Sequence, residues 1–305
     1  MKRILVAVSL ALVAVARAAS AAGEGGDSER DVVGEAVRGG LLDPAAPLEK
    51  RMAYVAEMET IVQRVKDPFL LYVLGSLYRQ GEDSPAVPVT KDLDRAREYL
   101  SRAALSGSVL AMAKLSAIES QAKNRFEANV WAQLHFHYGK ELARLDRRIP
   151  ESFAASVLGA AQDGFADSQR AALNDSVGMM ISTHDAAIMK GVQALADRQA
   201  SNPLRTARGE RCTLMDLQKI SRGKGGKPAS FAMAEFYLSF SSDGSVDHVW
   251  ALDGWPDAAF ARAVRPCAMA YRVEPAAALE AGDQLAMLPV QYSDQRHRIR
   301  QDDGT

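Results

Sequence analysis

Histidine and cysteine are the residues of this chain best suited to chemistry, and their spacing argues against a metal site. There are two cysteines and five histidines, at positions 135, 137, 184, 248 and 297. His135 and His137 are two residues apart and would point in different directions on a helix. Zinc sites need more ligands, in short regular spacings. We therefore predict no metal and no cofactor.

Catalytic motifs are also missing from the sequence. It contains neither a G-x-S-x-G nor an H-E-x-x-H pattern. Asp243 and Asp257 fit a turn and a helix cap better than a catalytic carboxylate pair. We therefore predict that the protein is not an enzyme. A hydrolase acting on cell-wall material is the alternative.

The first 18 residues, MKRILVAVSLALVAVARA, have the pattern of a secretory signal peptide. Lys2 and Arg3 precede a 13-residue apolar run, and small residues follow it, with cleavage expected after Ala18 or Ala21. As a helix, the run would cover about 20 Å of a membrane core about 30 Å thick. We expect an exported, periplasmic protein with no membrane span after cleavage.

Export changes how the two cysteines are interpreted. An oxidising compartment permits a disulfide between Cys212 and Cys267. In the chain-entropy model, closing such a loop stabilises the fold by roughly 4 kcal/mol. Two unpaired buried thiols are the alternative.

Charge disfavours a nucleic-acid-binding role. The 37 Lys and Arg residues balance 38 Asp and Glu residues, which gives a formal net charge of −1 and no global field for polyanions. One stretch, 201–228, is locally basic. We interpret it as a solvated connector; attraction to anionic lipid or cell-wall polymer is the alternative.

At 305 residues the chain has room for two modest domains. The predicted fold class is multidomain, with an all-α helical-repeat domain followed by a small α+β domain of ββαββ order. The predicted segments are a signal peptide (1–18), a flexible leader (19–47), the helical-repeat domain (48–200), the basic connector (201–228), the α+β domain (229–294) and a charged tail (295–305).

Apolar residues recur at helical spacing from 48 to 200. Asp67 and Pro68 predict a helix start that Gly81 ends, and a second helix begins near Asp92 and stops before Gly107. Two further helices are predicted around 111–120 and 127–142. The result is a series of antiparallel helix pairs.

These pairs resemble the Sel-one-like repeat, a relative of the tetratricopeptide repeat, over about 100 residues. The matching residues are Leu74, Gly75, Tyr78 and Gly81 in the first helix and Asp92, Ala96, Leu100, Ala103, Ala104 and Gly107 in the second. The resemblance implies stacked helix pairs with a concave surface for partners. A generic antiparallel bundle is the alternative.

The fourth predicted helix carries our candidates for a partner-binding groove. They are Trp131, His135 and Tyr138, which lie on adjacent faces of that helix. Plain core is the alternative for these three residues.

After residue 228 the apolar period changes to two, which predicts strands. Residues 235–240 alternate as a half-buried strand, Asp243 and Gly244 supply a two-residue hairpin turn, and a second strand carries residues 246–252. A helix follows Asp257. Two further strands are predicted within 270–276 and 283–292.

This module resembles the C-terminal domain of the TonB energy-transducer family, over about 65 residues. The matching residues are Asp243, Gly244, Val246, Gly254, Asp257, Ala258, Ala259, Ala263, Val264, Tyr271, Pro275, Pro289, Val290 and Tyr292. The resemblance implies a sheet that binds extended peptide by strand addition at an edge. We expect Leu288, Val290 and Tyr292 to form that edge. The membrane helix and Pro-rich spacer of energy transducers are absent from this sequence.

Together these patterns predict a non-catalytic periplasmic adaptor. Its partner would be an envelope protein or peptide, with an outer-membrane transporter as one candidate. A TonB-like energy transducer or transport accessory is the alternative.

Overall fold

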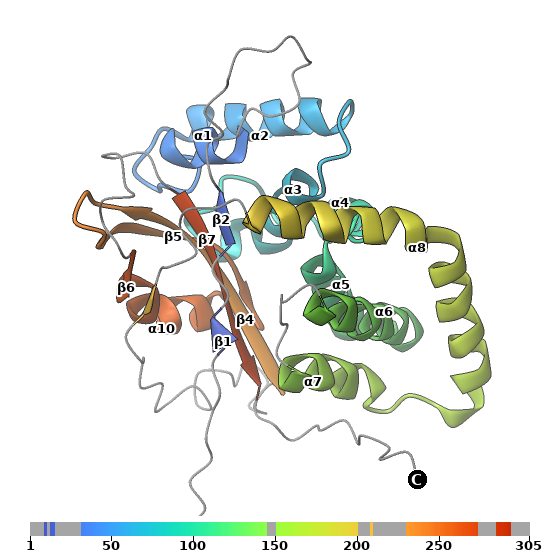
Figure 1. Ribbon diagram of the computed structural model, residues 1–305. Helices are drawn as coiled ribbons and strands as arrows, with labels where there is room; N and C mark the ends of the chain where they lie inside the picture. The colour runs from blue at the N-terminus through green and yellow to red at the C-terminus, as the bar shows by residue number, and fades with distance from the viewer. Residues whose placement is uncertain are drawn as a thin grey trace, which may run out of the picture.

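The computed structural model describes residues 32–144, 151–200, 230–273 and 285–293, together with short strands at 9–10, 13–15 and 208–209. Helices form one thick layer, an antiparallel sheet lies against it, and helix α10 (Ala258–Met269) covers the other face of the sheet (Figure 1). The predicted combination of a helical region and a small α+β region is confirmed at this level. No helix in the described ranges has the length and apolarity needed to cross a membrane.

The helical layer follows chain order, and from α3 to α7 each helix packs on the next. Its helices are α1 (Val32–Arg38), α2 (Leu48–Val62), α3 (Pro68–Gln80), α4 (Leu93–Leu105), α5 (Val109–Gln121), α6 (Arg125–Arg144), α7 (Glu151–Gln162) and α8 (Arg170–Ala200). Short 3-10 turns, Gly81–Asp83 and Asp167–Gln169, follow α3 and precede α8. The long helix α8 runs along the outside of this layer in Figure 1.

The predicted starts of α3 and α4 are confirmed by their caps. The Asp67 carboxylate accepts hydrogen bonds from the main-chain N–H groups of Phe69 (2.8 Å) and Leu70 (3.3 Å). Asp92 caps α4 in the same way, at 3.1 and 3.0 Å. These bonds satisfy N–H groups that have no partner inside the first helical turn. Gly81 ends α3 with φ +50°, a conformation that favours glycine.

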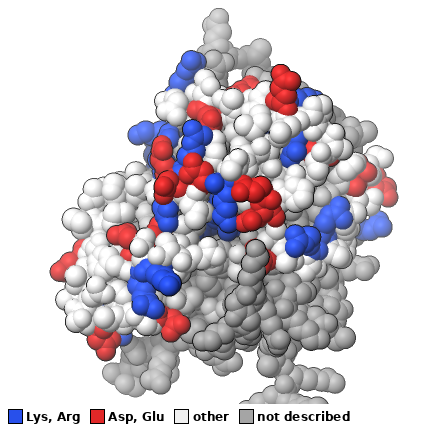
Figure 2. All heavy atoms as spheres, turned by 180° about the vertical axis from the view of Figure 1, so that it is seen from behind, with Lys and Arg blue, Asp and Glu red and all other residues white. Residues whose placement is uncertain are grey.

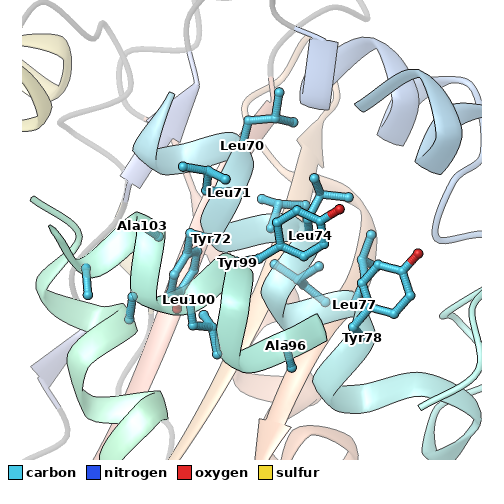
Figure 3. Packing of buried hydrophobic residues seen from close by; sticks show 14 of the residues in the cluster. Leu70, Leu71, Tyr72, Leu74, Leu77, Tyr78, Ala96, Tyr99, Leu100 and Ala103 are labelled. Carbon is cyan, nitrogen blue, oxygen red and sulfur yellow. The ribbon is translucent and has the colours of Figure 1, made fainter. Parts of the chain in front are cut away.

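The first helix pair packs closely because a glycine lies at the contact. A Cβ at Gly75 would sit 2.6 Å from Cγ of Leu100 on α4, so a larger residue would push the helices apart. Figure 3 shows Leu74, Tyr99, Leu100 and other apolar side chains of α3 and α4 converging on one core. Helix α3 is buried from Leu70 to Gln80, since α4 covers one side and the sheet another.

The predicted flexible leader is wrong for residues 32–47. Helix α1 lies in this range, and Val33, Leu41 and Leu42 are buried in the core of the helical layer. The Arg51 guanidinium Nε donates to the Leu41 carbonyl at 3.0 Å and holds the segment against α2. Apolar side chains outside a clear helical period were enough to dock it.

The sheet has β4 (Phe231–Phe240) at its centre, flanked by β5 (Val246–Trp255) and β7 (Leu285–Ser293), all antiparallel. The β4–β5 hairpin is confirmed, but its two-residue turn is wrong. The loop covers Ser241–Ser245 and is closed by a hydrogen bond from the Ser241 N–H to the Ser245 carbonyl (2.8 Å). Gly244 takes φ +82° within it.

The strand predicted within 270–276, the third of the four, does not join this sheet. Strand β6 (Tyr271–Arg272) pairs instead with β3 (Arg208–Gly209) as a separate two-stranded sheet. Apart from β3, the predicted connector at 201–228 lies outside the described residues, as does the charged tail at 295–305.

Both faces of the sheet are buried along β4 and β7, which corrects the prediction of a half-buried strand at 235–240. Phe236 and Leu238 pack with α10, whereas Tyr237 belongs to the core of the helical layer and Glu235 is 1% exposed. An alternating pattern usually indicates that the polar face of a strand is exposed to solvent. Here the helical layer covers that face. At the β7 end, the hydroxyls of Ser293 and Ser156 on α7 lie 2.7 Å apart.

Candidate functional site

The outer edge of β7 is the candidate site, and in the full chain it is occupied. On one side β7 pairs with β4 in unbroken register from Ser293 to Leu285. On the other side it pairs, antiparallel, with β1 (Ser9–Leu10) and β2 (Val13–Val15). The prediction of an open edge is therefore wrong for the full chain. The occupant comes from the segment that we predict to be a removable signal peptide.

The two short strands keep one register along β7. Strand β1 lies opposite Gln291 and Val290, and β2 lies opposite Met287 to Leu285. Between these runs are Leu288 and Pro289, which have no strand partner on this side among the described residues. The described residues of the N-terminal segment therefore follow one alignment along this edge.

The side chains of the three predicted edge residues are buried. Leu288, Val290 and Tyr292 are at most 1% exposed and belong to the cluster under α10. Their side chains fix β7 on the sheet and do not face a partner. What β7 offers along its edge is main-chain hydrogen bonding, with buried apolar side chains above and below.

A buried network of charges fixes the sheet on the helical layer. The Arg79 guanidinium, on α3, forms a two-pronged ion pair with the Asp253 carboxylate on β5. The Lys114 ammonium, on α5, lies 2.7 Å from Asp253 Oδ2 and also contacts the Glu235 carboxylate on β4. Tyr72 donates its hydroxyl hydrogen to Glu235. Side chains of two helices thereby hold two strands.

Burial shifts the pKa values of this network. It lowers the pKa of Lys114 to about 8, against the opposing effect of Asp253. It raises the pKa of Glu235 well above the usual value, and the nearby Asp253 charge adds to the rise. Burial also acts to raise the pKa of Asp253, but Arg79 and Lys114 outweigh it and the net shift is downward. Asp253 is thus the carboxylate that keeps its charge.

This network is an anchor rather than a reaction centre. Arg79, the most exposed of the four charged residues, is 7% exposed, and Lys114 is fully enclosed. Sequence reasoning missed all four. The available signal was a single charge inside an apolar run, such as Lys114 in AMAKLSAI or Glu235 in FAMAEFYL.

The opposite edge of the sheet, β5, is protected by the fold itself. The Gly254 N–H donates to the Gln80 side chain (3.2 Å), and the Gly254 carbonyl accepts from Arg79 (2.8 Å). The β4–β5 register also shifts twice, between Glu235 and Phe236 and between Ser239 and Phe240. Side-chain caps and bulges both hinder the pairing of another strand.

The predicted groove on the fourth helix is core. Trp131, His135 and Tyr138 lie on α6 and are 9%, 0% and 0% exposed. Burial lowers the pKa of His135 to about 4, although a contact with the Val109 carbonyl acts against the shift. Tyr138 donates to Asp185 on α8 at 3.2 Å. The three side chains join helices and line no partner surface.

Cys267 is buried and disulfide-bonded. Cys212, its expected partner, lies outside the described residues, so the pairing stays a prediction. Among the described residues, no cluster of His, Cys, Asp and Glu could hold a metal ion.

Surface charge is mixed on the face drawn in Figure 2, where basic and acidic groups lie side by side. Exposed ion pairs also occur among the described residues, such as Arg97 with Asp94 at 2.8 Å and Arg95 with Glu59 at 3.1 Å. This face therefore presents no broad single-sign surface for a polyanion.

Comparison of the chain with protein-family models, curated proteins and solved structures gave no match.

Proposed function

We propose that the protein is an exported, non-catalytic interaction protein that binds an extended segment of an envelope partner at the outer edge of β7. Binding would add one antiparallel strand to the sheet, a mode in which main-chain hydrogen bonds supply affinity. Strand β7 suits this role because it pairs with β4 in unbroken register and is anchored in the sheet.

The pairing of β7 with β1 and β2 is the observation that carries the proposal. This pairing supports the proposal that the β7 edge accepts an antiparallel strand, because five β7 residues have a strand partner there. The accepted segment lies within the predicted signal peptide. In the processed protein, the same edge would be vacant.

The helical layer is less suited to this role than its repeat pattern suggests. Helices α3, α5 and α7 turn one face toward the chain's own sheet, through Arg79, Lys114 and Ser156 respectively. Tandem repeats often use such a face for partners. Here that face is covered, which leaves β7 as the better-supported site.

Peptide binding by the processed chain tests the proposal. The chain lacking residues 1–18 would be titrated against a fluorescein-labelled peptide of residues 5–17, LVAVSLALVAVAR, with fluorescence anisotropy as the readout. We expect saturable binding that unlabelled peptide reverses.

The full chain with residues 1–18 retained is the matched control. Because its edge is occupied, it should bind the peptide at least tenfold more weakly. Equal binding by both chains, or no binding by the processed chain, would contradict the proposal.

A further inference from the structure

We propose that the Lys114 side chain condenses with the Glu235 carboxyl group inside the folded protein, forming an isopeptide bond between α5 and β4. The bond joins residues 121 positions apart and makes the anchor between the helical layer and the sheet covalent. The charge network is closed to an outside substrate, since Lys114 is fully enclosed. The reaction open to it is therefore one between its own side chains.

The fold brings the nucleophile and the electrophile into contact. Lys114 Nζ lies 2.5 Å from Glu235 Oε2, and the two side chains are 0% and 1% exposed. Ser76 Oγ, on α3, accepts a hydrogen bond from Nζ at 2.5 Å and holds the nitrogen in place. Well-oriented groups of one molecule reach effective concentrations of about 10⁵–10⁸ M. Contact of this kind favours a reaction that free amines and carboxylic acids do not undergo in water.

Burial favours the protonation states that condensation requires. Desolvation lowers the pKa of Lys114 to about 8, which makes the neutral, nucleophilic amine accessible. Desolvation also raises the pKa of Glu235 well above its usual value, so the carboxyl group is held as the acid, the form that loses water. An ionisable pair is costly to bury, and condensation removes that cost.

Asp253 and Tyr72 are placed to assist the reaction. Asp253 Oδ2 lies 2.7 Å from Lys114 Nζ. Arg79 pairs with this carboxylate, which stays ionised and can accept the amine proton as a general base. Tyr72 donates its hydroxyl hydrogen to Glu235 Oε1, the atom on which negative charge develops when the nitrogen attacks. Both groups contact the reacting atoms.

The step balances without an added reagent. Lys114 Nζ attacks Glu235 Cδ, the C–N bond forms, and Asp253 takes one amine proton. The Cδ–Oε2 bond then breaks, and Oε2 leaves as water with its own carboxyl proton and the proton held by Asp253. One hydrogen stays on the amide nitrogen. Because the amine is consumed, the titration of Lys114 near pH 8 belongs to the chain before it reacts.

The mass of the reduced, denatured protein tests the proposal. The purified full chain, with residues 1–18 retained, should be lighter by one water molecule than its sequence requires. Lys114→Met should have the full sequence mass. Lys190→Met, at an exposed lysine on α8, is the matched control and should keep the loss of water. A wild-type chain at full sequence mass overturns the proposal.

Peptide mapping of the wild-type chain does not depend on whether a variant folds. A tryptic digest of the denatured protein should contain the peptide that carries Lys114 joined to the peptide that carries Glu235. Trypsin should not cut after Lys114, and fragment ions should locate the bond at Glu235. Cleavage after Lys114, or a bond at Asp253 instead, overturns the assignment.

A time course tests the role of Tyr72. Chain made by cell-free synthesis would be sampled at intervals and its mass followed. Tyr72→Phe keeps the ring and removes the oxyanion donor, so the loss of water should slow about 10²-fold. Tyr54→Phe, on α2, is the control and should react at the wild-type rate. Equal rates for all three chains would overturn the role of Tyr72, and strand addition at β7 is independent of every outcome.

Discussion

The two outer edges of the sheet are closed in different ways. The β5 edge is protected by permanent parts of the fold: Arg79 and Gln80 cap the main chain at Gly254, and two register shifts distort the ladder. The β7 edge is regular and is covered by two short strands from the N-terminal segment. A sheet that must avoid unwanted pairing protects its edges. In the proposed function, removal of the N-terminal segment would leave β7 as the edge open to pairing, while the β5 edge stays protected.

The largest effect should come from breaking the β5 cap. Arg79→Ala leaves the buried Asp253 carboxylate with Lys114 as its one charged partner among the described residues, and removing one partner of a buried ion pair typically costs about 3–5 kcal/mol. Urea unfolding of the variant measures this loss. Arg170→Ala is the control, since its pair with Asp167 is exposed and such pairs contribute about 0–1 kcal/mol. Similar losses in both variants would show that the network does not anchor β5.

The next largest effect is a pH dependence of stability, which should involve the β5 anchor and not the β7 edge. The folded pKa of Lys114 is lowered to about 8 from 10.5. Between those values the unfolded chain holds a proton that the folded chain has released, so stability rises with pH. The gain approaches about 3 kcal/mol, from 1.36 kcal/mol per pKa unit. Lys114→Met should abolish the rise in urea-unfolding experiments from pH 8 to 10.5.

No described member of the charge network lies on β7, so the affinity of the 5–17 peptide should change little from pH 7 to pH 9. A large change would show that the β7 edge depends on the β5 anchor.

Removing residues 1–18 should cost less than breaking the cap. The lost contacts are a few edge hydrogen bonds, each contributing about 0.5–1.5 kcal/mol, so the total should be about 2–3 kcal/mol. Hydrogen exchange gives the sharper measurement. Outward-facing amides of β7 should exchange faster after truncation, while the amide of Gly254 stays protected. Faster exchange at Gly254 instead would contradict the assignment of the two edges.

The smallest effect should come from the exposed part of β5. Asp247 and His248 are exposed and contact each other at 2.8 Å. Asp247→Ala should change the free energy of unfolding by no more than about 0.5 kcal/mol, as is usual for surface sites. It should also leave peptide affinity unchanged. A loss of peptide binding would place the site on the wrong edge.

Local signals in the sequence predicted local structure well. Asp67 and Asp92 correctly predicted helix starts, because a capping carboxylate accepts hydrogen bonds from N–H groups no more than three residues away. The switch to an apolar period of two correctly predicted β4 and β5. Asp257 correctly predicted the start of α10, where its carboxylate accepts a hydrogen bond from the Ala259 N–H. The predicted length of the β4–β5 turn was wrong, because a hydrogen bond between Ser241 and Ser245 closes a longer loop.

Long-range packing could not be predicted in the same way. The alternation around Glu235 indicates one polar face, and only the docking of α3 and α5 reveals that this face is buried. The near-continuous apolar composition of FAMAEFYL was a usable signal that both faces would be covered. The pairing of the N-terminal segment with β7 could not be predicted, because a predicted signal peptide is not expected to form part of the mature fold.

The three ties between helices and strands also constrain how this architecture can change. Arg79 reaches β5, Lys114 reaches β4 and Ser156 reaches β7, one from every second helix. A tandem array can normally gain or lose a unit without penalty to its neighbours. Here an added helix pair would shift every later tie away from its strand. The sheet therefore fixes the spacing of α3, α5 and α7, and insertion of a helix pair between them should destabilise the fold.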